Sequence, residues 1–135
     1  MTPFEKLLIA HLVGDWILAQ THWEAMNKAK NWLACSSHAL KWTLAMLFGL
    51  MWAIGSADIP AKAMGVLLLM GVLHAIIDRR WPVLWLFRLK EYLPFGDPWA
   101  RGPSPLTLNP PIWLIIALDQ VLHIVQVAII AAVIA

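Results

Sequence analysis

Histidine and aspartate recur four residues apart inside apolar segments of this 135-residue chain. Three such pairs are present, namely His11 and Asp15, His74 and Asp78, and the reversed pair Asp119 and His123. Residues i and i+4 share one face of an α-helix, so each pair directs two ionisable groups to the same side. Ionisable groups inside apolar helices are costly and indicate function. Any fold of this chain must therefore bring these pairs to polar partners in its interior.

The composition is typical of an integral membrane protein. Hydrophobic residues make up 61% of the chain and charged residues 13%, and the mean hydropathy is +0.70. A chain of this length forms one domain. The net charge of +2 is too small to indicate binding to nucleic acid. We therefore expect the lipid bilayer as the main partner, and oligomerisation remains open.

Four apolar segments predict an all-α fold, a four-transmembrane-helix bundle. The expected helices cover about residues 4–20, 32–54, 61–78 and 112–135, with a hydrophilic loop over residues 21–31. Between the third and fourth helices, a short helix over about residues 81–93 is expected to lie in the membrane interface. A proline-rich loop follows it up to Pro111. That loop is as compatible with a linker as with a lid over a substrate site.

Basic residues predict the orientation of the bundle. The loops after the first and third segments contain most of them, namely Lys28, Lys30, Arg79, Arg80, Arg88, Lys90 and Arg101. The positive-inside rule places these loops in the cytoplasm and both termini outside. All three pairs, and the additional His38 of the second segment, then lie in the cytoplasmic half. Each aspartate is nearer the cytoplasm than its histidine, by about 6 Å along the helix axis.

This arrangement predicts a metal centre. Carboxylates buried in lipid need compensation, which a divalent cation supplies. Imidazole nitrogen and carboxylate oxygen are ordinary ligands of zinc, manganese and iron, with zinc as the first expectation. The candidate ligands for one or two ions are His11, Asp15, His38, His74, Asp78, Asp119 and His123. The alternative is a hydrogen-bonded polar core that only holds the helices together.

Further polar residues are candidates for contacts with these ligands or with a substrate. They are Gln20, Lys41, Arg79, Arg80, Gln120 and Gln126. Lys41 lies three residues after His38, where it would balance negative charge or bind an anion, or else extend to the interface. The two arginines after the third segment would bind a phosphate group or simply anchor the helix.

The segment HLVGDWILAQ, together with Lys28, His38, HAIID and DQVLH, resembles a family of small bacterial and phage membrane proteins of unknown function. The resemblance covers the chain except for the loop from Tyr92 to Pro111. It implies a multi-pass protein of the bacterial inner membrane, and it does not indicate which activity the protein has. The positions it implies are His11, Asp15, Gln20, His38, His74, Asp78, Asp119 and His123. A weaker likeness, limited to intramembrane histidine and aspartate, is to bacterial membrane-bound metal-dependent hydrolases.

Three functions are compatible with these residues. The first expectation is a metal-dependent hydrolase acting on a phosphoester or other lipid-like substrate from the cytoplasmic leaflet. In it, Asp15, Asp78 and Asp119 would be the catalytic carboxylates. The second is a metal-ion or proton carrier or channel, which the apolar outer halves of the second and third segments disfavour. The third is a non-catalytic membrane partner protein with a structural polar core.

Overall fold

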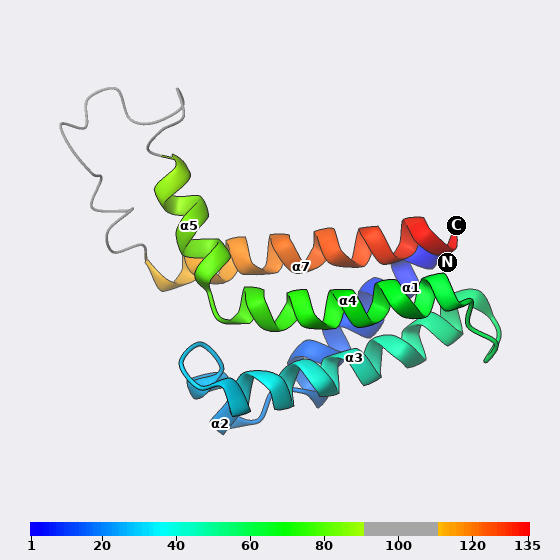
Figure 1. Ribbon diagram of the computed structural model, residues 1–135, viewed down its shortest axis with the longest axis horizontal. Coiled ribbons are helices and arrows are strands. Elements are labelled where there is room, and N and C mark those ends of the chain that lie inside the picture. Colours follow the sequence, from blue (N-terminus) through cyan, green and yellow to red (C-terminus); the bar gives the residue numbers. More distant parts are fainter. Residues whose placement is uncertain (91–110) are drawn as a thin grey trace.

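The computed structural model describes residues 1–90 and 111–135, and these residues form helices with no strand among them (Figure 1). The helices are α1 (Pro3–Leu12), the π-helix η1 (Val13–Leu18), α2 (His22–Asn27), α3 (Trp32–Ile54), α4 (Ala61–Asp78), α5 (Trp81–Lys90) and α7 (Ile112–Ile134). The predicted all-α class is confirmed. The proline-rich loop before Pro111, and the end of the helix predicted up to residue 93, lie outside the described residues.

Four helical segments run side by side and form a bundle. α1 packs against α3 and α7, and α4 packs against the same two helices, so the order around the bundle is α1, α3, α4, α7. Both termini and the connection between α3 and α4 lie at one end, and α2 and α5 lie at the other (Figure 1). The two basic connections therefore emerge at the same end of the bundle, as the sequence predicts.

Local signals place the ends of α3 and α4 where they were predicted. The side chain of Asn31 accepts hydrogen bonds from the backbone N–H groups of Leu33 and Ala34, which caps the start of α3. Gly55 follows the last residue of α3 with a φ of 79°, a left-handed conformation that glycine adopts without strain. Pro60 then precedes α4.

The first segment differs from the single helix predicted over residues 4–20. α1 ends at Leu12, and the chain continues as η1, in which the N–H of Ala19 donates to the carbonyl of Gly14 at 2.8 Å. Gly14 lies against α3, where an added Cβ would be 2.7 Å from the Cβ of Ala45. π-Helical turns of this kind occur frequently at functional sites. The short helix α2 is a further difference, because only a hydrophilic loop was expected there.

Two of the described helices, α4 and α7, are long and apolar enough to cross a membrane. α3 matches α7 in length, but its first half contains the polar residues His38 and Lys41. α1 has ten residues before η1 begins. Of the four predicted spans, two therefore meet the length and apolarity of a membrane-crossing helix within the described part of the chain.

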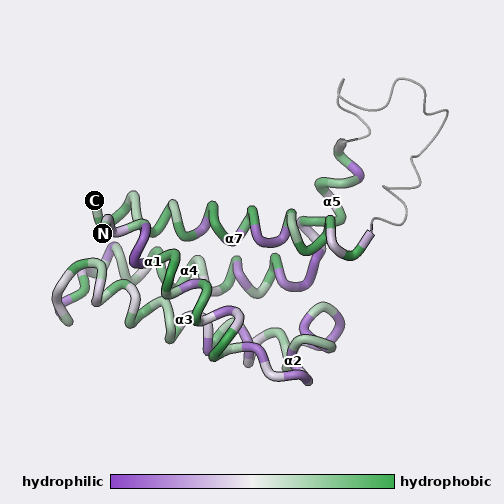
Figure 2. Tube along the Cα trace, turned by 180° about the vertical axis from the view of Figure 1, so that it is seen from behind, coloured by the Kyte–Doolittle hydropathy of each residue, from purple (hydrophilic) through white to green (hydrophobic). Residues whose placement is uncertain are grey.

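Polar and apolar side chains occupy different halves of the bundle interior. Along α4 and α7, hydrophilic residues lie toward the end that carries α2 and α5 (Figure 2). The other half is filled by an apolar cluster that includes Leu7, Met46, Leu50, Leu67, Val127 and Ile130, each at most 1% exposed. The polar residues of the sequence motifs are thus confined to one half.

Glu24 holds α2 against α3. Its carboxylate accepts a hydrogen bond from the backbone N–H of Thr21, whose side chain in turn accepts from the N–H of Glu24. The same carboxylate accepts from the Ser37 hydroxyl and the Lys41 ammonium, both at 2.6 Å. Burial raises the pKa of the Glu24 carboxyl, but these hydrogen bonds outweigh burial and lower it to about 2. Lys41, for which the sequence left open a place beside the ligands or an extension to the interface, is paired with Glu24.

We expect Glu24→Ala to lower the free energy of unfolding by about 2–4 kcal/mol, because it removes charge-assisted hydrogen bonds from a buried position. The matched control is Glu5→Ala. Glu5 has the same capping position after Thr2 in α1 but is exposed, so its loss costs about 0.5–1 kcal/mol. Thermal unfolding in detergent measures both variants.

The pH dependence gives a second check on Glu24. Folding lowers the pKa of its carboxyl from 4.5 to about 2. The stabilisation is therefore fully present above pH 4.5 and is lost as the pH falls toward 2. The difference between the wild type and Glu24→Ala should shrink over that range. Equal losses for the Glu24 and Glu5 variants would contradict the role assigned to Glu24.

Candidate metal centre

Four histidines and two aspartates meet in the interior of the polar half. They are His11 of α1, Asp15 of η1, His38 of α3, His74 and Asp78 of α4, and His123 of α7. The histidines are completely buried, and neither aspartate is more than 2% exposed. The seventh predicted ligand, Asp119, lies at the edge with a side chain that is 14% exposed, and its Oδ2 is 3.7 Å from Nδ1 of His123. Helical spacing thus brings the predicted set together.

The imidazole rings of the cluster pack on one another. The ring of His74 stacks on Trp42 and on His123 with centroid distances of 4.2 Å each, and on His38 at 5.3 Å. His11 lies beside this stack, with its ring centroid 5.7 Å from that of His123. Rings from four different helical segments therefore form one continuous group.

Two carboxylates face the same two imidazoles. Oδ1 of Asp15 lies 2.8 Å from Nε2 of His38 and 3.7 Å from Nε2 of His74. Oδ2 of Asp78 lies 3.2 Å and 3.4 Å from the same two nitrogens. Two oxygen atoms and two nitrogen atoms thus converge on one region between η1, α3 and α4.

The backbone after η1 fixes the orientation of His38. Its Nδ1 lies 2.9 Å from the carbonyl oxygen of Ala19, and a carbonyl only accepts, so Nδ1 carries the hydrogen and donates it. Nε2 is then directed at Asp15 and Asp78. Histidines that bind metals commonly donate their other N–H to a backbone carbonyl in this way. The π-helix therefore supplies Asp15 and also positions the partner that orients His38.

Lys28 is a site residue that the sequence analysis did not include among the candidates. Its Nζ lies 2.8 Å from Oδ1 of Asp78, 3.3 Å from Nε2 of His38 and 4.0 Å from Oδ1 of Asp15. The ammonium group thus compensates buried carboxylates from a position surrounded by candidate ligand atoms. The available signal was the place of Lys28 among the residues that carry the family resemblance.

Several imidazole nitrogens of the cluster have no hydrogen-bond partner within residues 1–90 and 111–135. They are Nε2 of His11 and both ring nitrogens of His74 and of His123. Buried polar atoms are nearly always paired, and an unpaired one costs about 1–3 kcal/mol. Unpaired nitrogens beside carboxylates are the surroundings expected of a cation site.

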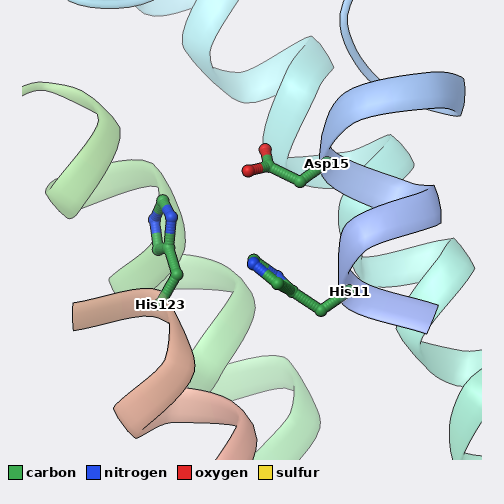
Figure 3. A group of neighbouring side chains, drawn as sticks. All are labelled: His11, Asp15 and His123. Carbon is green, nitrogen blue, oxygen red and sulfur yellow. The ribbon is translucent and has the colours of Figure 1, made fainter. Parts of the chain in front are cut away.

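Three groups in the cluster place potential ligand atoms within 4.8 Å of one another. They are His11, Asp15 and His123; Asp15, His38 and His74; and His74, Asp78 and His123. Figure 3 shows the first group, in which the three side chains point toward one another from α1, η1 and α7. The described residues therefore contain donors for a metal ion in more than one combination.

A cavity of about 280 Å³ adjoins the cluster. Its polar lining consists of Asp15, Gln20, Lys28, Asp78, Arg80, Asp119 and Gln120, and Trp16, Ala25, Ile115 and Ile116 supply its apolar lining. Nε2 of Gln120 donates to Oδ2 of Asp15 at 3.4 Å, which links α7 to η1. Three carboxylates and two cationic side chains thus face one space beside the potential metal ligands.

Three of the six further polar residues, Lys41, Arg79 and Gln126, do not line this cavity. The guanidinium of Arg79 is 4.7 Å from the ring centre of Trp32 and 5.4 Å from that of Trp81, a position typical of an anchor. Nε2 of Gln126 donates to the carbonyl of Met70 at 3.2 Å, inside the bundle. Neither side chain lines the cavity, whereas Arg80, next to Arg79, does.

One protein-family model, described as "Protein of unknown function (DUF3307)", matches residues 4–135. A search of curated proteins found no match. A search of solved structures found none either. The resemblance to a family of unknown function, which the sequence motifs predicted, is confirmed, and the comparisons supply no activity.

Proposed function

The chain belongs to this family of unknown function, and we propose that it is a membrane-embedded, metal-dependent hydrolase of phosphoesters. The observation that carries the proposal is the buried cluster of four histidines and two aspartates. Within the described residues, five imidazole nitrogens of that cluster have no partner. A structural polar core would instead pair its nitrogens with hydrogen-bond partners.

A membrane location is supported by an inverted distribution of polarity. The histidines are buried, whereas large apolar side chains such as Ile17, Phe48 and Trp113 are 72%, 68% and 66% exposed. Lipid solvates the exposed apolar side chains and provides no hydrogen bonds, so polar groups gather inside the bundle. Water would instead disfavour so many large apolar side chains on the surface. We propose four spans, formed by α1 with η1, by α3, by α4 and by α7. In this arrangement α2 and α5 face the cytoplasm of a bacterial cell and both termini lie outside.

The proposed ligands of a divalent ion are Asp15, His38, His74 and Asp78, because their donor atoms converge. Mixed nitrogen and oxygen donors suit zinc first, and also manganese or iron. His123 of α7 lies close enough to His74 and Asp78 to complete the coordination or to help hold a second ion, and Asp119 lies beside His123. A divalent ion bound there would supply Lewis-acid activation of water and of a phosphoryl oxygen.

The side chains around the cavity suit an anionic substrate with an apolar part. Lys28 and Arg80 provide positive charge for a phosphate group. Asp119 is the proposed general base, because it lines the cavity, is partly exposed, and lies beside His123. Ile115 and Ile116 form an apolar wall suited to the first carbons of a lipid chain. These features favour a lipid phosphate reached from the cytoplasmic leaflet.

The proposal predicts that the purified protein contains a divalent metal in near-stoichiometric amount. His38→Ala and His74→Ala should each lower the metal affinity by more than about 10–100-fold, the loss caused by removing even an outer partner of a ligand. His22→Ala is the matched control, because His22 is exposed and lies outside the cluster. Elemental mass spectrometry measures the metal in each variant.

The activity is tested with phosphatidic acid in mixed micelles as the probe. Phosphate release should require added zinc or manganese after treatment with a chelator, and the His22 variant should retain it. A wild-type protein without metal that also fails to bind added metal would contradict the proposal. So would metal-loaded protein that releases no phosphate from any phosphoester offered.

A further inference from the structure

His11 has two ring nitrogens in different surroundings, and these surroundings fix where its hydrogen lies. The indole N–H of Trp42 donates to Nδ1 of His11 at 2.8 Å. An indole N–H is only a donor, so Nδ1 must be the bare nitrogen that accepts. A neutral imidazole carries one hydrogen, which therefore lies on Nε2. Both side chains are completely buried, so water does not compete for this bond.

His38 has the opposite arrangement. Its Nδ1–H donates to the carbonyl of Ala19, which leaves Nε2 directed at Asp15 and Asp78. The oxygens that Nε2 faces only accept hydrogen bonds, so a metal ion bound between them would take the place of the hydrogen on Nε2, and Nδ1 would keep its own hydrogen bond to Ala19. At Nε2 of His11 the same exchange is disfavoured, because binding a metal there would move the hydrogen to Nδ1, against the N–H of Trp42.

The Nε2–H of His11 points into the cluster. Nε2 has no partner at hydrogen-bonding geometry within the described parts of the chain, although the side chain of Gln120 lies beside the ring. The ring of His11 is directed toward the space between Asp15 and His123 (Figure 3). A buried N–H group without an acceptor is costly, so this position is suited to an acceptor supplied by a bound molecule.

We propose that His11 is an oxyanion-binding residue rather than a metal ligand, and that Trp42 is the positioning residue that fixes its hydrogen on Nε2. The acceptor is an anionic oxygen of the phosphate group bound at the metal, so the inference rests on the proposed function. A neutral histidine that is held as an N–H donor stabilises negative charge on an oxygen without giving up its proton. His11 thereby leaves the predicted set of seven ligands.

The tautomer is measured directly by long-range ¹H–¹⁵N correlation spectra of protein labelled at histidine. The His11 signals, assigned by their absence in His11→Gln, should show a hydrogen on Nε2 and a bare Nδ1. In Trp42→Phe the indole donor is lost while an aromatic ring still packs on His74, so the hydrogen should distribute over both nitrogens. A hydrogen on Nδ1 in the wild type would overturn the proposal, whether or not metal is present.

Binding measurements separate an oxyanion-binding residue from a ligand. Zinc content should be unchanged in His11→Phe and His11→Gln, whereas His38→Ala should lose zinc. Inorganic phosphate should bind zinc-loaded His11→Phe about 10–100-fold more weakly than the wild type, the cost of one hydrogen bond to a charged group. His11→Gln retains an N–H donor and should keep most of the affinity, and Trp42→Phe should show a smaller loss than His11→Phe.

The outcomes also distinguish this inference from the proposed function. A wild-type protein that cannot be loaded with metal would overturn the proposed function, and the tautomer would still be read from the spectra. A metal-containing wild type whose zinc is lost in both His11 variants would overturn only the role given to His11. Equal phosphate affinity in the wild type and His11→Phe would also overturn the role of His11 and leave the proposed function standing.

Discussion

Lys28→Met is expected to destabilise the metal-free protein by about 3–5 kcal/mol, the cost of removing one partner from a buried ion pair. The ammonium of Lys28 lies 2.8 Å from Asp78 and 4.0 Å from Asp15, and both carboxylates are buried. Methionine fills a similar volume but leaves these carboxylates without a positive charge. Thermal unfolding in detergent, in the presence of a chelator, measures the loss.

Divalent metal is expected to restore most of the stability of Lys28→Met. Nζ of Lys28 lies among the atoms proposed to bind the ion, including Nε2 of His38 at 3.3 Å. An ion and the ammonium group therefore compete for the same carboxylates, and in the variant the ion has no competitor. Zinc at 100 times its dissociation constant stabilises a protein by about 2.7 kcal/mol, and the gain should be larger for Lys28→Met than for the wild type.

Lys30→Met is the matched control, because Lys30 lies two residues further along the same loop and is exposed. It should change the stability by less than about 0.5 kcal/mol in either condition. If Lys28→Met is equally destabilised with and without metal, the cluster is a structural polar core and the metal centre is wrong. This comparison requires no knowledge of the substrate.

The helical spacing of His11 and Asp15, and of His74 and Asp78, was sufficient to predict that these residues meet. An i, i+4 pair shares a helix face regardless of the remaining fold, and each such face had to be buried against the others. The position of Lys28 was not predictable in the same way. It reaches the cluster through α2 and the connection to α3, and no periodic pattern relates it to Asp78.

The π-helix η1 also lies beyond sequence reasoning, because it depends on tertiary contact. Nothing in the residues from Val13 to Leu18 forbids an α-helix. The backbone changes from α-helix to the wider π-helix where Gly14 lies against Ala45 of α3. The ends of α3 were predictable because Asn31 and Gly55 are local signals.

Which helices cross a membrane was harder to predict than the positions of the long helices α3, α4 and α7. The polar residues that build the site, such as His38 in α3 and Asp15 in η1, reduce the apolarity of the segments that contain them. α4 and α7 also contribute ligands, but their remaining residues are apolar enough to compensate. Where half of a bundle interior is polar, the residues of the site themselves lower the apolarity by which a membrane-crossing helix is recognised in the sequence.

We expect reconstituted protein to hydrolyse substrate but to move neither metal ions nor protons across vesicles. A carrier must open its site to both faces of the membrane in turn. Between the cluster and the end that carries the termini, the interior is filled by buried apolar residues, including Leu7, Leu50, Leu67, Val127 and Ile130. Ions cross such a region only at high cost. Gln126, the buried polar residue beyond His123 on α7, is already bonded to Met70.

Asp119→Asn distinguishes a hydrolase from a carrier. Asp119 lines the cavity but is the most exposed of the proposed acidic residues, so its conversion to asparagine should leave the fold intact. Loss of a general base should reduce turnover by about 10²–10⁴-fold, while Asp58→Asn, in the exposed connection between α3 and α4, should change nothing. Phosphate release and vesicle flux are measured on the same preparations. Metal-dependent flux that disappears in Asp119→Asn would decide for a carrier, because a site sealed on one side cannot produce it.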